Sequence, residues 1–238
     1  MGTPTVYQWL KLRRLINYFT PGVCFLCLDK CADQLILCAG CRADLPRSKH
    51  GHNRSNLADG SLSTIQISSC SVEIIDRVIT SFNYKFPVNK LIHQFKYHQK
   101  LTIASALGLE LASTVLKVST SLPDCILPVP LHKLRYFRRG FNQALEIANV
   151  VANELGLLVD ADILLRTRNT LAQFALIARE RNRNLRGAFR LSSIPEYKHV
   201  AIIDDVITTG ATVNEIARLL KLAGVQRVEA WACASAES

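Results

Sequence analysis

The segment Ala201–Thr212 carries the residues best suited to bind a phosphorylated sugar. Its apolar start predicts a buried strand, which leads into two adjacent carboxylates, a Thr/Gly loop and a helix. Ligands of open parallel sheets lie at the carboxyl ends of the strands. The two acids can accept hydrogen bonds from a vicinal diol, while the loop amides and the helix N-terminus attract a phosphate monoester. The segment therefore predicts a ribose 5-phosphate site, formed by Asp204, Asp205, Val206, Thr208, Thr209, Gly210, Ala211 and Thr212.

Two other interpretations of this segment stay open. Acidic pairs at strand ends also bind Mg²⁺, as in phosphatases. The loop can also be an ordinary turn between a strand and a helix. A Walker A loop is excluded, because no Gly-Lys-Ser/Thr sequence follows the strand.

Eight cysteines are many for 238 residues, and five of them fall between residues 24 and 41. Four of these form two Cys-x-x-Cys pairs, which can present four thiolates to one ion in a tetrahedral shell. A redox function is the rival explanation, although redox motifs rarely come as adjacent pairs. Because four thiolates leave no open position for a substrate, we expect a structural zinc ion, or iron in its place, bound by Cys24, Cys27, Cys38 and Cys41.

The neighbours of the two cysteine pairs have simpler expected roles. The ten residues between the pairs can form a short hairpin, and Gly40 can adopt a positive φ in the second turn. Cys31 could substitute as a ligand, but a spare thiol is the favoured interpretation. Cys70, Cys125 and Cys233 lie among apolar neighbours, which predicts small core residues.

The composition is that of a folded, basic protein. An apolar content of 49% supplies a sizeable core and excludes disorder throughout the chain. A formal net charge of +10 and a pI near 9.4 favour polyanionic partners such as nucleic acids or phosphorylated metabolites.

The chain offers no targeting or membrane-spanning signal. Residues 6–19 predict an amphipathic helix that packs on the rest of the protein, and no signal peptide is recognised there. No stretch approaches the ~18 apolar residues that a membrane span needs. We therefore expect a cytoplasmic protein, in which thiols stay reduced and metal binding is favoured over disulfides.

Helix and strand patterns alternate from about residue 71 onward. Helices are expected over 88–95, 101–116, 142–155 and 212–223, and strands over 74–79, 124–129, 163–165, 199–203 and 227–232. Such alternation predicts an α/β fold with a mostly parallel sheet and helices on both faces. We expect this domain over residues 70–238, after an N-terminal helix, a four-Cys zinc module and a linker over residues 1–69.

The same residues resemble a known group of proteins. Asp204–Thr212 is similar to the fingerprint of type I phosphoribosyltransferases, which bind phosphoribosyl pyrophosphate (PRPP). Further stretches resemble the ComF/GntX family, as do the cysteine module and its place ahead of the transferase-like domain. They are Pro128–His132 with Arg138–Gln143, Arg166–Gln173 with Arg179–Phe189, and the stretch that ends in Phe95 and Lys96. The resemblance covers nearly the whole chain, with Cys31 and residues 46–69 as departures.

The resemblance implies a type I phosphoribosyltransferase-like fold that binds PRPP, or a related phosphoribosyl ligand, together with Mg²⁺. Asp204 and Asp205 would orient the ribose, and Arg138 and Arg139 would stabilise the leaving pyrophosphate. It also implies a role in natural transformation, namely DNA uptake and the handling of imported single-stranded DNA. A competence helicase and recombination proteins are the partners that it implies.

Basic residues gather in the middle of the chain, where residues 132–190 hold eleven Lys or Arg against five acids. Some of them can hold pyrophosphate. Others, beside Tyr136 and Phe137, can guide single-stranded DNA by backbone charge and base stacking. A solvated basic face is the simpler alternative for the cluster.

Two further functions stay open at this point. One is an active phosphoribosyltransferase that acts on a nucleobase or an amine, although no segment of the sequence indicates a binding pocket for the acceptor. The other is a zinc-containing nucleic-acid-binding module with a vestigial transferase site. The intact Asp204 and Asp205 argue against full loss of that site.

Overall fold

The computed structural model describes residues 22–31, 36–48, 52–53, 65–67, 70–72, 74–98, 101–168 and 185–236. The chain divides into two compact units, Met1–Leu45 and Pro46–Ser238. The helix expected over residues 6–19 lies outside the described residues, as do Arg179, Arg181 and Arg183.

The division between the units falls earlier in the chain than the boundary expected at residues 69 and 70. The Pro46 carbonyl accepts a hydrogen bond from the Asn83 amide at 2.8 Å, and the Ser48 amide donates to the Ser81 carbonyl at 3.0 Å. Strand β3 (His52–Asn53) also pairs with β6 (Arg77–Asn83). The described residues just after Leu45 therefore extend the edge of the larger unit.

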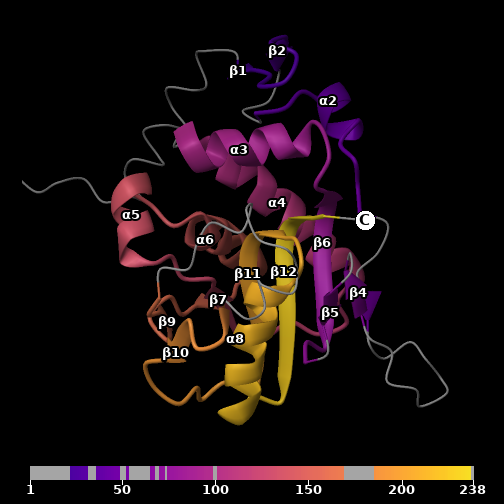
Figure 1. Cartoon of the computed structure of the whole chain (residues 1–238). Coiled ribbons are helices and arrows are strands. Elements are labelled where there is room, and N and C mark those ends of the chain that lie inside the picture. Colours follow the sequence, from indigo (N-terminus) through magenta and orange to yellow (C-terminus); the bar gives the residue numbers. More distant parts are fainter. Residues whose placement is uncertain are drawn as a thin grey trace, which may run out of the picture. The chain divides into compact units, whose positions relative to one another are not determined.

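A six-stranded sheet forms the centre of the larger unit, in the order β3-β6-β12-β11-β7-β8 (Figure 1). The strands not yet placed are β7 (Cys125–Pro128), β8 (Leu158–Val159), β11 (His199–Ile207) and β12 (Arg227–Ser235). All neighbouring strands run parallel except β3, which lies antiparallel at one edge. The predicted mostly parallel sheet is confirmed. Two antiparallel pairs lie outside it, β4 (Ile65–Ile67) with β5 (Cys70–Val72) and β9 (Leu164–Arg166) with β10 (Phe189–Leu191).

The two long central strands, β11 and β12, each contain an apolar run, Val200–Ile203 and Ala230–Ala234. Strands covered on both faces lack the alternation of a half-exposed strand. Ile203 and Trp231 are paired across this ladder, and both are fully buried. Cys125 and Cys233 are also fully buried, which confirms them as core residues.

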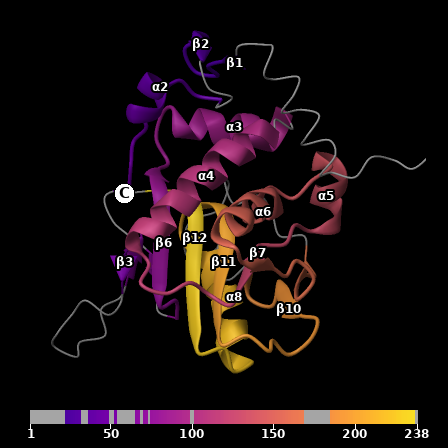
Figure 2. The ribbon, with the colours of Figure 1, turned by 180° about the vertical axis from the view of Figure 1, so that it is seen from behind.

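Helices cover both faces of this sheet. The helices α4 (Leu101–Val118) and α6 (Gln143–Leu155) cover one face, and α8 (Ala211–Leu222) covers the other (Figures 1 and 2). The helices α4 and α6 approach closely at Gly108, where an added Cβ would lie only 2.8 Å from Val150 Cβ. A larger residue at position 108 would therefore force these two helices apart.

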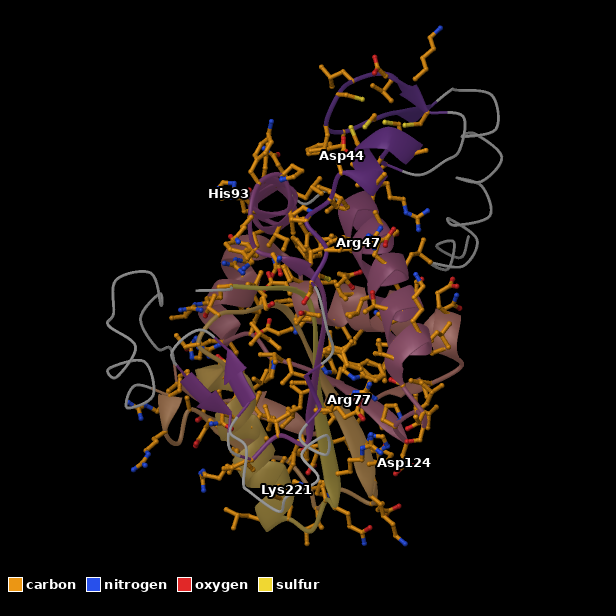
Figure 3. All side chains as sticks on the ribbon, turned by 90° about the vertical axis from the view of Figure 1, so that its right-hand side faces the viewer. Asp44, Arg47, Arg77, His93, Asp124 and Lys221 are labelled. Atoms are coloured by element: carbon orange, nitrogen blue, oxygen red, sulfur yellow. The ribbon has the colours of Figure 1, made fainter. Side chains whose placement is uncertain are left out.

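Helix α3 (Val88–His98) and helix α5 (Lys133–Arg139) complete the described helices of this unit. Helix α3, which carries His93, lies toward the opposite end of the strands from Arg77, Asp124 and Lys221 (Figure 3). All four predicted helices of the α/β domain are present, and Gly156 and Gly224 follow two of them with positive φ. The sequence patterns did not predict α5.

The smaller unit has little secondary structure among its described residues. A two-stranded pair, β1 (Gly22–Val23) with β2 (Lys30–Cys31), encloses the first Cys-x-x-Cys pair, and α2 (Ala39–Ala43) holds the end of the second. A hairpin was expected over the ten residues between the two pairs, of which 32–35 lie outside the described residues. The hairpin that the structure describes surrounds the first pair. Gly40 lies within α2 and is not among the positive-φ glycines, so its expected turn geometry was wrong.

Candidate functional site

The carboxyl end of β11 carries the predicted ligand residues into the start of α8. Asp204 and Asp205 lie within the strand, Thr208 and Thr209 follow it, and Gly210 precedes the helix. Gly210 has a φ of 72°, a left-handed conformation that a residue with a side chain adopts only at a cost. The chain therefore turns sharply, and the acids and the helix N-terminus share the same end of the sheet.

The two acids form one closely coupled pair. Asp205 is buried, and its amide donates a hydrogen bond to Asp204 Oδ1 at 2.8 Å. Burial and the neighbouring charge of Asp205 raise the pKa of Asp204 to about 7, even though Lys96 and Arg166 lower it. Two carboxylates so close to each other are costly to ionise together, which makes this pair a strong attractor for a cation or for hydroxyl donors.

Lys96 of α3 balances this negative charge. Its Nζ lies 2.7 Å from Asp205 Oδ2, and only 20% of the Lys96 side chain is exposed. Burial lowers the pKa of Lys96, but the charges of Asp205 and Asp204 raise it above its ordinary value. Lys96 was not among the predicted site residues, although the stretch that ends in Phe95 and Lys96 had been matched to the ComF/GntX family.

Helix α8 starts in a way that suits a phosphate. Its N-cap residue, Gly210, provides no side-chain hydrogen bond to the first turn. The Thr209 hydroxyl accepts a long 3.5 Å hydrogen bond from the Ala211 amide. The first amides of a helix have no partners within the helix and carry the positive end of its dipole. Val206 and Thr212 are half-buried beside this turn, so the whole predicted set is brought together.

The junction between α5 and α6 is fixed against the same end of the sheet. Asn142 Nδ2 donates to the Val129 carbonyl at 3.1 Å, and the Val129 amide donates to the Ile203 carbonyl at 2.9 Å. Arg139 Nη1 donates to Gln143 Oε1 at 3.0 Å. The side chain of the predicted Arg139, the last residue of α5, therefore contacts the first residue of α6. Arg138 belongs to α5, but its side chain lies outside the described part of the chain.

A second cation that prediction missed, Arg166, lies near the acids. Burial and the charge of Arg135 lower the pKa of Arg166 to about 10, while Asp204 raises it. Its guanidinium also stacks over the Phe189 ring, with 5.2 Å from Cζ to the ring centroid. The signal that could have found it was its position at the start of a stretch already matched to the ComF/GntX family.

The strands β9 and β10 stay paired beyond their ends. The Thr167 amide donates to the Ala188 carbonyl at 2.9 Å, and Arg168 Nη1 donates to the Arg186 carbonyl at 3.1 Å. The Gly187 amide donates in turn to Glu215 Oε1 of α8 at 3.0 Å. The residues just before β10 are therefore connected, through Gly187, to α8, which begins at the predicted phosphate site.

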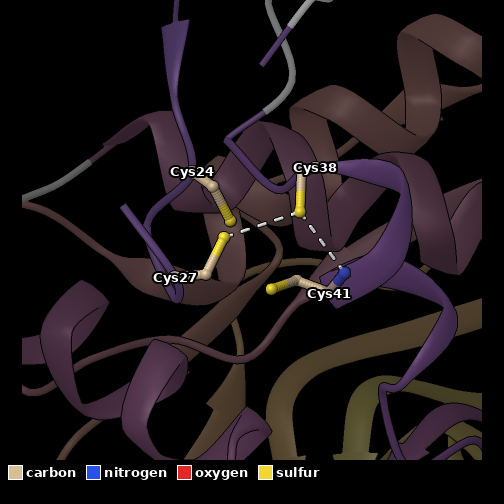
Figure 4. A group of neighbouring side chains, drawn as sticks. All are labelled: Cys24, Cys27, Cys38 and Cys41. Atoms are coloured by element: carbon tan, nitrogen blue, oxygen red, sulfur yellow. Dashed lines mark hydrogen bonds between the residues drawn. The ribbon is translucent and has the colours of Figure 1, made fainter. Parts of the chain in front are cut away.

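The smaller unit brings its four predicted metal ligands together (Figure 4). The sulfur atoms of Cys24, Cys27, Cys38 and Cys41 all lie within 4.8 Å of one another. The Cys27 and Cys38 sulfurs are 3.7 Å apart. A tetrahedral shell with zinc–sulfur bonds of about 2.3 Å has sulfur–sulfur edges of about 3.8 Å. The cluster therefore fits a metal ion with four thiolate ligands.

Local backbone geometry supports this cluster. Cys38 caps α2, since its sulfur accepts a hydrogen bond from the Cys41 amide at 3.4 Å. Burial opposes ionisation of Cys24, but hydrogen bonds from the backbone of Cys27, Cys38 and Leu26 lower its pKa to about 6. Cys31 is buried beside the cluster but is not one of its four members.

Comparison with known proteins gives these sites a family context. A family model described as "phosphoribosyl transferase domain" matches residues 141–237. The DNA utilization protein YhgH of Escherichia coli K12 is 42% identical over 159 residues, which cover 65% of this chain and 70% of that protein. Competence protein F of Haemophilus influenzae is 35% identical over 168 residues, which cover 68% and 73%. The chain belongs to the ComF family.

Membership in the ComF family confirms the resemblance drawn from the sequence. Competence protein ComFC of Streptococcus pneumoniae is 33% identical over 103 residues, which cover 43% of this chain and 44% of that protein. This ComF-family chain is a competence-associated protein with a type I phosphoribosyltransferase-like fold and a four-Cys cluster that could hold a metal ion. Within its described residues, no helix has both the length and the apolar content needed to cross a membrane.

Proposed function

We propose that this protein binds PRPP together with Mg²⁺ at the carboxyl end of β11. The proposal depends on one observation. The Asp204–Asp205 pair is joined by a short turn to a helix that starts at a left-handed glycine without a side-chain cap. Acceptors for a diol and donors for a phosphate then lie one short turn apart. A ribose 5-phosphate carries both groups.

Each part of the site has a role in this proposal. Asp204 and Asp205 orient the ribose hydroxyls, and the amides around Gly210 and Ala211 hold the 5-phosphate. Arg138, Arg139 and the newly found Arg166 supply positive charge for the pyrophosphate. When bound, Mg²⁺ supplies further charge stabilisation of the pyrophosphate oxygens. The residues fit Mg²⁺, because the adjacent carboxylates of Asp204 and Asp205 supply oxygen ligands of the kind that it prefers.

A thermal-shift measurement tests this site. PRPP with Mg²⁺ should raise the melting temperature, and the double variant Asp204→Asn/Asp205→Asn should lose that shift. Asp162→Asn is the matched control, since Asp162 is exposed before β9 and removal of its charge leaves the site intact. Absence of any shift in the wild-type protein would refute the proposal.

We further propose that the protein handles imported single-stranded DNA during natural transformation in the cytoplasm. The names of the relatives, which refer to DNA utilization and competence, support this role. Helix α5 adds a physical argument, because it exposes 87% of Phe137 and 51% of Tyr136 among basic residues. Exposed aromatic rings between cations suit base stacking along a charged strand. A competence helicase and recombination proteins are the proposed partners.

A deletion strain, scored separately for transformation and for nucleotide salvage, tests this role. We expect transformation to fall while salvage stays normal, and a plasmid copy of the gene should restore transformation. Lost salvage with normal transformation would contradict the proposal and favour a metabolic phosphoribosyltransferase.

We propose zinc as the ion of the four-Cys cluster and a structural role for it. Four thiolates complete a tetrahedral shell and leave no position for a substrate. The described apolar core of the smaller unit is also very small. It consists of Cys24, Cys31, Leu37 and Leu45, which is too little to fold this unit without a metal.

A further inference from the structure

The Lys96 side chain is fixed beside the acidic pair. Its neighbour on α3, Phe95, is fully buried, and the Phe95 and Phe141 ring centroids are 5.4 Å apart. Phe141 directly precedes Asn142, whose side chain is bound to the end of β7. These contacts hold the backbone of Lys96 at the end of the sheet. The Lys96 ammonium can therefore contact Asp205 without a large rearrangement of α3.

The ammonium occupies an oxygen that a metal ion would need. Lys96 Nζ lies 2.7 Å from Asp205 Oδ2, and that oxygen has no hydrogen bond of good geometry in addition to this ion pair. Mg²⁺ binds carboxylate oxygens at about 2.0–2.1 Å. An ammonium and a divalent cation repel each other strongly across one carboxylate, so the Lys96 charge at Asp205 opposes metal binding there.

We propose that Lys96 is an internal cation that occupies the acidic pair in the ligand-free protein and must be displaced before a divalent cation binds there. The free protein would then bind Mg²⁺ weakly, and a PRPP–Mg²⁺ complex would bind well, because the displaced ammonium can pair with the phosphate oxygens. This inference rests on the proposed function of the site. Lys96 would disfavour the binding of Mg²⁺ alone and favour the binding of Mg²⁺ together with PRPP.

Direct metal binding tests the inference without any measurement of activity. Mn²⁺ is the probe, titrated without PRPP and followed by electron paramagnetic resonance. Replacement of Lys96 with methionine removes the competing charge, so Lys96→Met should bind Mn²⁺ about tenfold more tightly than the wild type, since a charge at this distance shifts such equilibria by one or more powers of ten. Lys96→Arg should behave like the wild type, and Lys90→Met, an exposed position on the same helix, is the matched control.

The same variants separate this role from a merely structural one. For Lys96→Met we expect tighter Mn²⁺ binding but weaker PRPP binding, whereas a structural defect would weaken both. An Mn²⁺ affinity unchanged from that of the wild type in folded Lys96→Met would overturn the inference. Failure of the wild type to bind PRPP would instead refute the proposed function, while the Mn²⁺ comparison would still decide the role of Lys96.

A measurement on the wild type decides the case in which Lys96→Met does not fold. Acetic anhydride modifies lysine amines according to their accessibility, and mass spectrometry reads each site. Saturating Mn²⁺ alone should raise the acetylation rate of Lys96 relative to that of Lys90. An unchanged ratio would show that the metal does not displace the ammonium and would overturn the inference.

Discussion

Asn142 joins the start of helix α6 to the end of strand β7 through both ends of its amide. Nδ2 donates to the Val129 carbonyl at 3.1 Å, and Oδ1 accepts from the Ala144 amide at 3.1 Å, which caps the helix. One side chain therefore aligns the helix with the strand next to the acidic pair. Substitutions of Asn142 can remove the bond to Val129 with or without the bond from Ala144.

Asn142→Asp should keep the helix cap and lose the donor to Val129, whereas Asn142→Ala should lose both. Loss of a good N-cap costs about 0.5–2 kcal/mol, so Asn142→Ala should be the less stable variant in urea unfolding. Both variants should weaken the PRPP-induced thermal shift. Asn149→Ala, an exposed position on the same helix, should leave stability and the shift unchanged.

The buried carboxylate of Glu229 should make the folded protein less stable in acid. It is fully buried, and it accepts hydrogen bonds from Trp231 Nε1 at 2.8 Å and Arg227 Nη2 at 2.7 Å. Burial raises the pKa of Glu229, but hydrogen bonds from His199 and Trp231 and the charge of Arg227 lower it below its ordinary value of 4.5. Its stabilising contribution is therefore present above pH 4.5 and is lost as the pH falls through the lower folded-state pKa.

Urea unfolding of the wild type and Glu229→Gln, followed by far-UV circular dichroism, checks the direction of this pH dependence. The difference in unfolding free energy should be largest near pH 7 and should shrink below pH 4.5. Glu154→Gln, an exposed position on α6, serves as the control. A difference that grew toward acid pH would contradict the assignment.

The four-Cys cluster predicts one bound metal ion per chain. Cys24→Ser and Cys38→Ser should each lower the metal content measured by mass spectrometry of the purified protein, and strong chelators should unfold the smaller unit. Cys31→Ser should keep the metal, because Cys31 is not among the four clustered sulfurs. Loss of metal from Cys31→Ser would show a different ligand set.

Helix α5 predicts that base stacking contributes to DNA binding. Phe137→Ala should weaken the binding of single-stranded DNA about fivefold or more, which corresponds to the loss of one base stack. The slope of binding against salt concentration should stay the same, because no phosphate contact is lost. Fluorescence anisotropy with a labelled oligonucleotide measures both, and Leu158→Ala, which changes another exposed apolar residue on β8, is the control.

In the same measurement, Arg135→Gln should change the dependence of DNA binding on salt concentration, which Phe137→Ala leaves unchanged. Its loss should reduce the salt slope, by about 0.7 for each phosphate contact removed from a single strand. A salt-independent affinity of the wild type would remove the electrostatic part of the DNA proposal.

The sequence was most informative where side-chain type and chain order coincide. The strand–acid–glycine–helix order around Asp204 and Gly210 predicted the local geometry, because all of its parts are consecutive. The two cysteine pairs predicted their cluster for a similar reason, since two short motifs with fixed spacing leave few arrangements. Long apolar strands such as β11 were equally clear, because burial on both faces leaves a continuous pattern.

Prediction failed where contacts join distant parts of the chain or where a helix has no buried face. Lys96 lies more than one hundred positions before Asp205, and only the fold brings their side chains to 2.7 Å. Helix α5 was missed because its apolar residues, Leu134 and Phe137, are mainly exposed and follow no buried stripe. Its ends depend on His132 as N-cap and Gly140 as C-cap, which are weak signals without that stripe.

The arginine-rich connection from Arg168 to Leu185 leaves and rejoins the fold at two neighbouring strands. Hydrogen bonds such as that from Thr167 to Ala188 already hold its two ends together. The chain entropy lost in closing a connection grows slowly with its length, by about 0.6 kcal/mol for each doubling. The pairing of β9 with β10, which includes Arg166 and Phe189, therefore depends more on these hydrogen bonds than on the exact number of residues between the strands.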